Sequence, residues 1–226
     1  MRDYFALLKS SPLFDGIQEE NLTGMLQCLN ARSIPYRKDE ILLLAGQPIA
    51  SAGLVLSGRV QIIKEDYSGN RTILTEVSPG YLFAEAFACA QSSHLPITVI
   101  SVSECQILWL DVQRVVSVCS SACQFHTRLI ENLLAILASN NILLNQKIDH
   151  LSKRTTREKL LSYLSDQAIR QGLDEFEIPF SRQELADYLC VERSAMSAEL
   201  SRMQNDGLLC FKSRRFRLLN QPFNDS

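Results

Sequence analysis

The sequence lacks the long apolar runs that a membrane protein needs. A helix that crosses a bilayer requires about 18 or more consecutive apolar residues, and runs such as 41–45 are far shorter. The first residues, 1–14, mix charged and apolar side chains without the basic region and apolar stretch of a signal peptide. We therefore expect a cytoplasmic protein with no membrane contact.

Paired cysteines of the C-x-x-C type are also missing. The chain has 7 cysteines, an odd set that fits neither a secreted disulfide framework nor a zinc ribbon. Reduced and mostly buried thiols are therefore expected. Cys119, Cys123 and His126 have a spacing that could place all three on one helix face, as a soft-metal or redox site or as ordinary core residues.

Catalytic motifs are absent as well. The sequence contains no G-x-S-x-G, no H-E-x-x-H and no G-x-x-x-x-G-K. We expect no enzyme, no catalytic residues and no metal ligands. A net charge of −2 gives no indication of nucleic acid, because only a local surface needs to be positive to bind it.

The first half of the chain has the pattern of an antiparallel β-structure. With 226 residues, of which 46% are hydrophobic, two modest domains are expected. Short apolar or alternating runs follow a helical lead at 12–29, and Ser68-Gly69-Asn70 is typical of a hairpin turn. The expected strands are 41–44, 54–56, 60–63, 73–77, 97–102 and 107–110. Regular short strands favour a barrel or jelly roll.

A long helix is expected next, because 112–151 contains neither glycine nor proline. Its apolar residues repeat with steps of four and three, which is the heptad pattern of a two-stranded coiled coil. The expected dimer interface consists of Ile130, Leu134, Leu137, Asn141, Leu144, Ile148 and Leu151. Asn141 would fix the register, although a helix packed on its own domain is the alternative.

The C-terminal part has the pattern of a winged helix-turn-helix. Ser181 and Glu184 form a capping box that opens a helix at 182–189, after a short extended run at 178–180. A second helix at 193–205 would present its first residues to the DNA major groove. Two strands, 208–211 and 216–219, follow and flank a basic turn. The expected DNA contacts are Arg193, Ser194, Ser197, Ser181, Arg182, Gln183, Lys212, Arg214 and Arg215.

The order of these parts resembles the Crp/Fnr superfamily of bacterial transcription regulators over the whole chain. The strongest resemblance is the stretch 181–197, SRQELADYLCVERSAMS, supported by Gly58-Arg59-Val60 and Pro79-Gly80. The resemblance implies an α+β fold: an effector-sensing β-roll (a double-stranded β-helix, jelly-roll-like) at 1–111, a dimerisation helix at 112–151 and a winged helix-turn-helix at 152–226. It also implies homodimers that bind double-stranded DNA, a small-molecule effector and RNA polymerase.

The expected effector pocket departs from the cyclic-nucleotide pattern of the family. That pattern has Phe-Gly-Glu and, ten residues beyond the Glu, an Arg that binds the cyclic phosphate. Here Glu85 is kept, but Leu95 stands at the Arg position, and a buried phosphate without its cation would be poorly compensated. Cyclic AMP is therefore not the expected effector. The expected pocket consists of Phe83, Ala84, Glu85, His94, Leu95 and Pro96.

The nature of the cofactor stays open. Haem would need an axial ligand such as His94, His126 or His150, and thiol redox chemistry is a second option. The recognition helix also departs from its relatives, with Ala198 where many have arginine and Cys190 where glycine is commonest. Arg193 is therefore the main expected base reader.

Two other function classes compete with the regulator. A cupin-like metalloenzyme on the roll would need a ligand set, but the roll has His94 alone and no H-x-H. A regulatory ligand-binding module without DNA contact is the other alternative, and the basic turn at 212–215 speaks against it.

Overall fold

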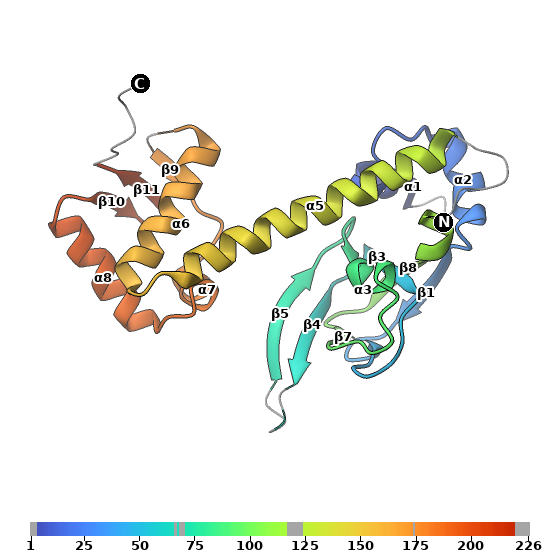
Figure 1. Ribbon diagram of the computed structural model, residues 1–226, viewed down its shortest axis with the longest axis horizontal. Coiled ribbons are helices and arrows are strands. Elements are labelled where there is room, and N and C mark those ends of the chain that lie inside the picture. The colour runs from blue at the N-terminus through green and yellow to red at the C-terminus, as the bar shows by residue number, and fades with distance from the viewer. Residues whose placement is uncertain (1–3, 66, 68–70, 117–123, 174, 220–226) are drawn as a thin grey trace. The chain divides into compact units, whose positions relative to one another are not determined.

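The computed structural model describes residues 4–65, 67, 71–116, 124–173 and 175–219 (Figure 1). The chain divides into two compact units, Met1–Ser139 and Asn140–Ser226. We call them unit 1 and unit 2 and describe each by itself. The predicted fold class is confirmed: a β-sheet domain comes first, then a long helix, then a helix-turn-helix. The three predicted domain boundaries stay a prediction.

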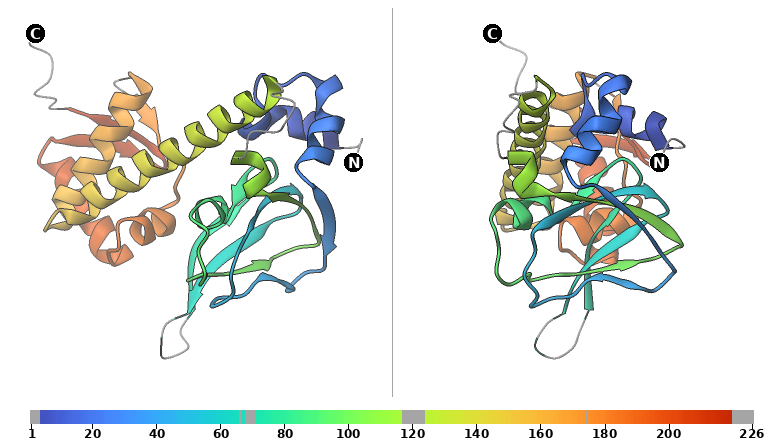
Figure 2. Two further views of the ribbon diagram at one scale, coloured as in Figure 1. Left: turned by 45° about the vertical axis from the view of Figure 1, so that its right-hand side comes forward. Right: turned by 90° about the vertical axis from the view of Figure 1, so that its right-hand side faces the viewer.

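Unit 1 is a β-roll of two antiparallel sheets that face each other (Figure 2). One sheet has the order β1-β8-β3-β6, formed by β1 (Arg32–Tyr36), β8 (Cys105–Asp111), β3 (Ser51–Ser57) and β6 (Leu82–Phe83). The other has the order β2-β7-β4-β5, formed by β2 (Ile41–Leu43), β7 (Thr98–Ser101), β4 (Val60–Glu65) and β5 (Arg71–Val77). All predicted strands of the roll are present.

Two strands of the roll, β1 and β6, were not predicted from the sequence. Strand β1, with the sequence RSIPY, has no clean alternation and contains Pro35, which is tolerated because β1 is an edge strand. Strand β6 is too short to show a period. The predicted hairpin turn at 68–70 lies outside the described residues, but β4 and β5 pair antiparallel from Val60 with Val77 to Glu65 with Arg71.

Strands β3 and β8 bury both of their faces, which explains their continuous apolar sequences. Val55 and Ile107 face the interior of the roll. Leu54 and Leu108 pack instead against the N-terminal helices α1 (Phe5–Ser10), η2 (Pro12–Phe14) and α2 (Glu19–Cys28). The sheet that contains β3 and β8 therefore lies between the core of the roll and a second, helical core.

The predicted long helix corresponds to α4 (Val112–Val116) and α5 (Gln124–Ser152), while 117–123 lie outside the described residues. One face of α5 belongs to unit 1, since Leu129 and Leu133 are buried in the helical core. Asn132 is also buried and donates hydrogen bonds from Nδ2 to the carbonyl oxygens of Leu13 (2.9 Å) and Asp15 (2.8 Å). This face of α5 packs on its own domain, and most of the predicted heptad residues lie on a different face of the helix.

Unit 2 contains α6 (Thr156–Gln171), α7 (Arg182–Tyr188), α8 (Arg193–Asn205) and a sheet of order β10-β11-β9. The strands are β9 (Glu175–Glu177), β10 (Leu209–Lys212) and β11 (Arg215–Leu218). Strand β9 was not predicted: it lies directly before the extended run expected at 178–180 and pairs with β11. Ile178 is 1% exposed and packs into the core of unit 2 directly after the strand.

Candidate nucleic-acid interface

The structure confirms the helix-turn-helix packing of α7 and α8. Leu185, Leu189, Met196 and Leu200 are all 0% exposed and form the contact between the two helices. The turn contains Cys190, whose φ of +52° is left-handed, so this is a position that favours glycine. The turn is closed by hydrogen bonds from backbone amides of the turn to carbonyl groups of α7.

Ion pairs link α8 to α6. Arg157 on α6 contacts Glu199 through Nε at 2.6 Å and Asp206 through Nη2 at 2.7 Å. The Arg157 guanidinium lowers the pKa of Glu199, so the carboxylate stays charged. Lys159 Nζ, also on α6, donates to the Leu189 carbonyl oxygen at 3.2 Å. Helix α6 therefore orients both the turn and the second helix of the motif.

Four of the predicted DNA contacts are brought together. Gln183 of α7 and Arg193, Ser194 and Ser197 of α8 line one shallow depression, to which Val191 and Glu192 also contribute. Glu192 was not among the predicted contacts. Its sequence signal was its place directly before the second helix, where an acidic side chain can cap the first turn.

The start of α7 is formed as expected, but its three predicted contacts differ in surroundings. Ser181 accepts a hydrogen bond from the Glu184 amide at 3.3 Å, and the Glu184 carboxylate accepts one from the Ser181 amide at 2.6 Å. The hydrogen bond from the Ser181 amide lowers the pKa of Glu184. Gln183 Nε2 donates to Asp187 at 2.9 Å. The side chains of this first turn are therefore partly engaged within α7 itself.

Arg182 packs on the hairpin formed by β10 and β11 and is half-buried. Its guanidinium lies over the rings of Phe211 (4.7 Å) and Phe216 (5.0 Å), and burial lowers its pKa. Arg182 therefore links the helix-turn-helix to β10 and β11. Its predicted contact with DNA stays a prediction.

The predicted basic turn is the tip of a β-hairpin. Strands β10 and β11 pair as far as Lys212 with Arg215, and Ser213 turns the chain with a φ of +57°. Lys212, Arg214 and Arg215 are exposed. Arg215 Nε lies 3.8 Å from Glu177 Oε2, an exposed pair that leaves the guanidinium accessible. The hairpin thus presents three cations to solvent.

The predicted effector pocket is largely filled by apolar side chains. Phe83, Ala84 and Leu95 are buried in one cluster inside the roll, with Leu95 only 2% exposed. A Cβ on Gly53 would come within 2.1 Å of the Phe83 ring, so the packing is tight here. Glu85 is buried, whereas His94 and Pro96 are exposed and His94 Nδ1 contacts Ser93 Oγ at 3.0 Å. The residue at the cation position thus belongs to an apolar core.

Trp109 lies next to this cluster. Its ring meets Phe83 edge-on, with centroids 5.5 Å apart, and its Nε1 donates to the Tyr36 hydroxyl at 3.1 Å.

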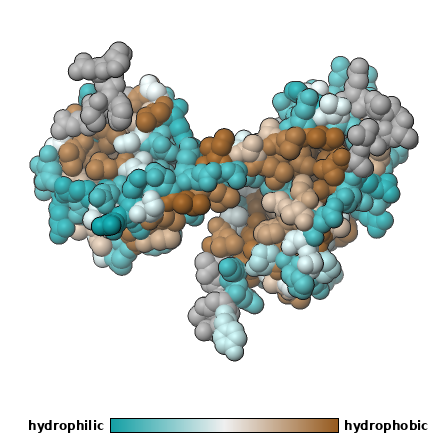
Figure 3. Space-filling view, in the orientation of Figure 1, coloured by the Kyte–Doolittle hydropathy of each residue, from teal (hydrophilic) through white to brown (hydrophobic). Residues whose placement is uncertain are grey.

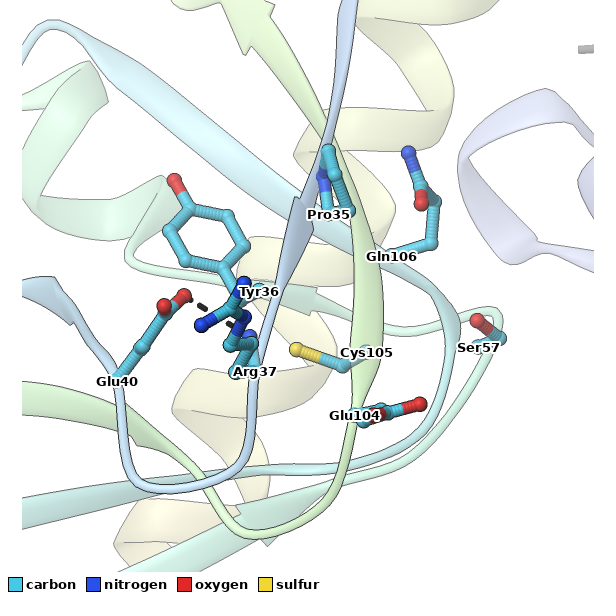
Figure 4. A pocket seen from close by; sticks show the side chains of 8 residues that line it. All are labelled: Pro35, Tyr36, Arg37, Glu40, Ser57, Glu104, Cys105 and Gln106. Carbon is cyan, nitrogen blue, oxygen red and sulfur yellow. Dashed lines mark hydrogen bonds between the residues drawn. The ribbon is translucent and has the colours of Figure 1, made fainter.

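A cavity of about 520 Å³ lies at the far end of β1 and is shown in Figure 4. There the Cys105 sulfur points toward the turn that carries Arg37, whose amide donates to Glu40 at 2.9 Å. Burial raises the pKa of Cys105, so its thiol stays protonated.

The possible redox or metal site at Cys119, Cys123 and His126 is only partly described. Cys119 and Cys123 lie outside the described residues. His126 is 4% exposed, and its Nε2 lies 3.8 Å from Cys28 Sγ, a contact that the sequence spacing did not predict. Within the described part of the chain, no group of three or more metal-ligating side chains comes together.

The predicted heptad residues of α5 separate into two groups. Ile130, Leu137 and Leu151 are half-buried, whereas Leu134, Leu144 and Ile148 are 61%, 60% and 63% exposed. Asn141 is exposed and accepts a hydrogen bond from Asn145 Nδ2 at 2.8 Å. Apolar side chains accordingly gather at the surface along α5 in Figure 3.

Across the described residues, none of the helices is long and apolar enough to span a membrane.

Comparison with known proteins agrees with this arrangement. Residues 33–122 match the family described as cyclic nucleotide-binding domain, and residues 158–222 match the Crp-like helix-turn-helix domain. The cyclic AMP receptor protein of Thermus thermophilus is 25% identical over 203 residues, covering 89% of each chain. The transcriptional activator protein FnrL of Cereibacter sphaeroides is 30% identical over 92 residues, covering 34% of this chain and 37% of FnrL.

Solved structures share the fold. The catabolite activator protein of Thermus thermophilus is similar with a TM-score of 0.56 and 22% identity, covering 92% of this chain and 93% of that one. The c-di-GMP-responsive global regulator CLP from Xanthomonas campestris has a TM-score of 0.57 and 18% identity, covering 90% and 100%. With a roll, a long helix and a Crp-like helix-turn-helix in this order, the chain belongs to the Crp/Fnr family of DNA-binding transcription regulators.

Proposed function

We propose that this protein is a homodimeric, effector-responsive transcription regulator that recognises a palindromic promoter site and works with RNA polymerase. The observation that carries the proposal is the single depression where Gln183, Arg193, Ser194 and Ser197 meet. Arginine reads guanine through two hydrogen bonds, and serine hydroxyls can bond to any base edge. The cations of the hairpin tip, Lys212, Arg214 and Arg215, suit DNA phosphates, as do the first residues of α7, Ser181 and Arg182.

The exposed heptad residues of α5 support the dimer. Leu134, Leu144 and Ile148 together expose a row of apolar surface that monomers rarely leave uncovered. A second copy of α5 would bury this row, with Asn141 facing Asn141 of the partner and fixing the register. Ile130, Leu137 and Leu151 complete the interface. Two recognition helices related by a two-fold axis read half-sites about one helical turn apart.

An effector other than cyclic AMP is part of the proposal. The pocket residues Phe83, Ala84, Glu85, His94, Leu95 and Pro96 combine an apolar interior with one buried carboxylate, and Leu95 replaces the phosphate-binding cation. Haem, redox-active thiols and an exchangeable small molecule are the candidates for the signal. Native mass spectra and visible absorption of the fresh protein distinguish these options, since a bound group adds mass and haem adds a visible band.

The test of DNA recognition is enrichment of duplexes from a random pool by the full chain, under several redox states. We expect a palindrome to be enriched, and Arg193→Glu to abolish its binding. Arg59→Glu is the matched control, because Arg59 is an exposed arginine of the roll whose side chain is 60% accessible. Enrichment of no sequence under any state, or unchanged binding by Arg193→Glu, would contradict the proposed function and favour a module without DNA contact.

A further inference from the structure

Glu192 lies directly before α8, and its carboxylate caps the first turn of that helix. One of its oxygens, Oε2, accepts from the Ser194 amide (2.7 Å), the Ala195 amide (3.1 Å) and the Ser194 hydroxyl. The other oxygen, Oε1, accepts no hydrogen bond within the described part of the chain. The side chain is therefore fixed by Oε2, while Oε1 keeps its acceptor capacity.

The surroundings of Glu192 are those of the predicted base-reading residues. Glu192 lines the same depression as Gln183, Arg193, Ser194 and Ser197, and it is exposed. The hydrogen bonds from Ser194 and Ala195 lower the pKa of Glu192, so it carries a negative charge at neutral pH. In a helix-turn-helix, the N-terminal residues of the second helix are those that reach base edges in the major groove.

The chemistry of a fixed carboxylate limits what it can contact on DNA. Phosphate oxygens are acceptors and negatively charged, so they repel Oε1. Among major-groove base edges, hydrogen-bond donors are the exocyclic amines of cytosine and adenine, and acidic side chains pair with cytosine N4. A carboxylate with a single available oxygen suits cytosine, which offers no neighbouring acceptor as adenine N7 does.

We propose that Glu192 is a specificity-determining residue that accepts a hydrogen bond from a cytosine amine through Oε1. This inference rests on the proposed DNA-binding function and adds to it the base that Glu192 recognises. Because a dimer reads a two-fold-symmetric site, the cytosine occurs once in each half-site. Arg193, the adjacent residue, supplies the complementary preference for guanine.

The test compares the base preferences of the full-length wild type with those of two variants, using duplexes enriched from a random pool. Glu192→Ser removes the carboxylate but keeps a good helix cap, so α8 remains formed. We expect it to lose roughly tenfold discrimination for cytosine at one symmetric position. Glu192→Gln retains a side chain of the same size, and we expect its preference at that position to move toward adenine, which glutamine reads through N6 and N7.

Glu158→Gln is the matched control. Glu158 is another exposed carboxylate that caps a helix of unit 2, since it accepts from the Thr155 amide at 3.0 Å at the start of α6. This variant removes the same charge, and we expect its base preferences to equal those of the wild type.

Several outcomes separate this inference from the proposed function. If both Glu192 variants bind every duplex more tightly with unchanged base preferences, the carboxylate only repels the DNA backbone and the inference is wrong. If the wild type enriches a palindrome without cytosine at a position sensitive to Glu192, the inference is also wrong but the proposed function stands. If the wild type enriches no sequence, the proposed function fails and the inference fails with it.

Discussion

Cys190 occupies a left-handed position in its turn, where glycine is the favoured residue. With a φ of +52°, it holds a conformation that costs an L-residue about 1–2 kcal/mol, while a glycine there costs extra chain entropy on folding. The side chain is exposed, so little packing is lost on its removal. We expect Cys190→Gly to stabilise unit 2 by about 0.5–1 kcal/mol in urea unfolding. Cys190→Ala, which keeps the strain, serves as the control and should show no such gain.

His150 gives a pH dependence to the stability of unit 2. It is 3% exposed, its Nδ1 contacts Ser162 Oγ at 2.8 Å, and its Nε2 lies 3.6 Å from Asp166 Oδ2. Burial lowers its pKa below the ordinary 6.5, outweighing Asp166 and Asp149, which raise it. Arg170 and Lys153 act in the same direction as burial.

The neutral form of His150 therefore belongs to the folded state. Because the folded pKa lies below the unfolded one, its contribution is fully present above about pH 6.5 and is lost as the pH falls through the lowered pKa. We expect the urea midpoint of the wild type to fall more than that of His150→Gln between pH 7.5 and pH 5.5. Parallel midpoints for the two proteins over this window would show that His150 does not titrate with unfolding.

At the level of elements, the contact between β3 and β6 requires that Gly53 has no side chain. A Cβ on Gly53 would lie 2.1 Å from the Phe83 ring, which is itself 1% exposed and cannot move away. We expect Gly53→Ala to destabilise unit 1 by about 1–3 kcal/mol, as overpacked cores do. Thermal unfolding measures this change.

Two further variants isolate the cause. Gly53→Ala combined with Phe83→Leu should recover part of the loss, because the smaller side chain gives the new methyl group room. Gly24→Ala is the control, since Gly24 lies inside α2 with nothing within 4 Å of an added Cβ. It should stabilise by about 0.5–1 kcal/mol through helix propensity alone. A stabilised Gly53→Ala would rule out the tight contact.

The elements of unit 2 were the most predictable from sequence, because capping and stop residues mark their ends. Ser181 and Glu184 placed the start of α7, and α8 was predicted with its observed bounds. The roll was harder: β1 and β6 carry no period of their own and owe their pairing to β8 and β3. The side-chain contacts of Arg182 and Glu192 could not be read from spacing, because they depend on tertiary packing and on the choice between two carboxylate oxygens.

At the scale of the whole molecule, the exposed row on α5 predicts the oligomeric state. Leu144→Lys with Ile148→Lys would place charges in the proposed dimer interface. We expect a monomer in light scattering, together with a loss of affinity for the proposed palindromic site of at least tenfold. Ile169→Lys is the control, because Ile169 is equally apolar and 70% exposed but lies on α6. A double variant that remains dimeric would place the interface elsewhere.

The single tryptophan of the chain gives unit 1 an optical signal that unit 2 does not share. Trp109 lies in the roll, against Phe83 and Tyr36, and unit 2 contains tyrosines but no tryptophan. Emission excited at the red edge of the absorption band therefore comes from unit 1 alone, even in the intact protein bound to DNA. A ligand that enters the roll changes the colour of that emission, while a dye on the duplex reports the other half at the same time. Ligand binding to the roll and binding to DNA can thus be timed separately in one cuvette, without adding a label to the protein.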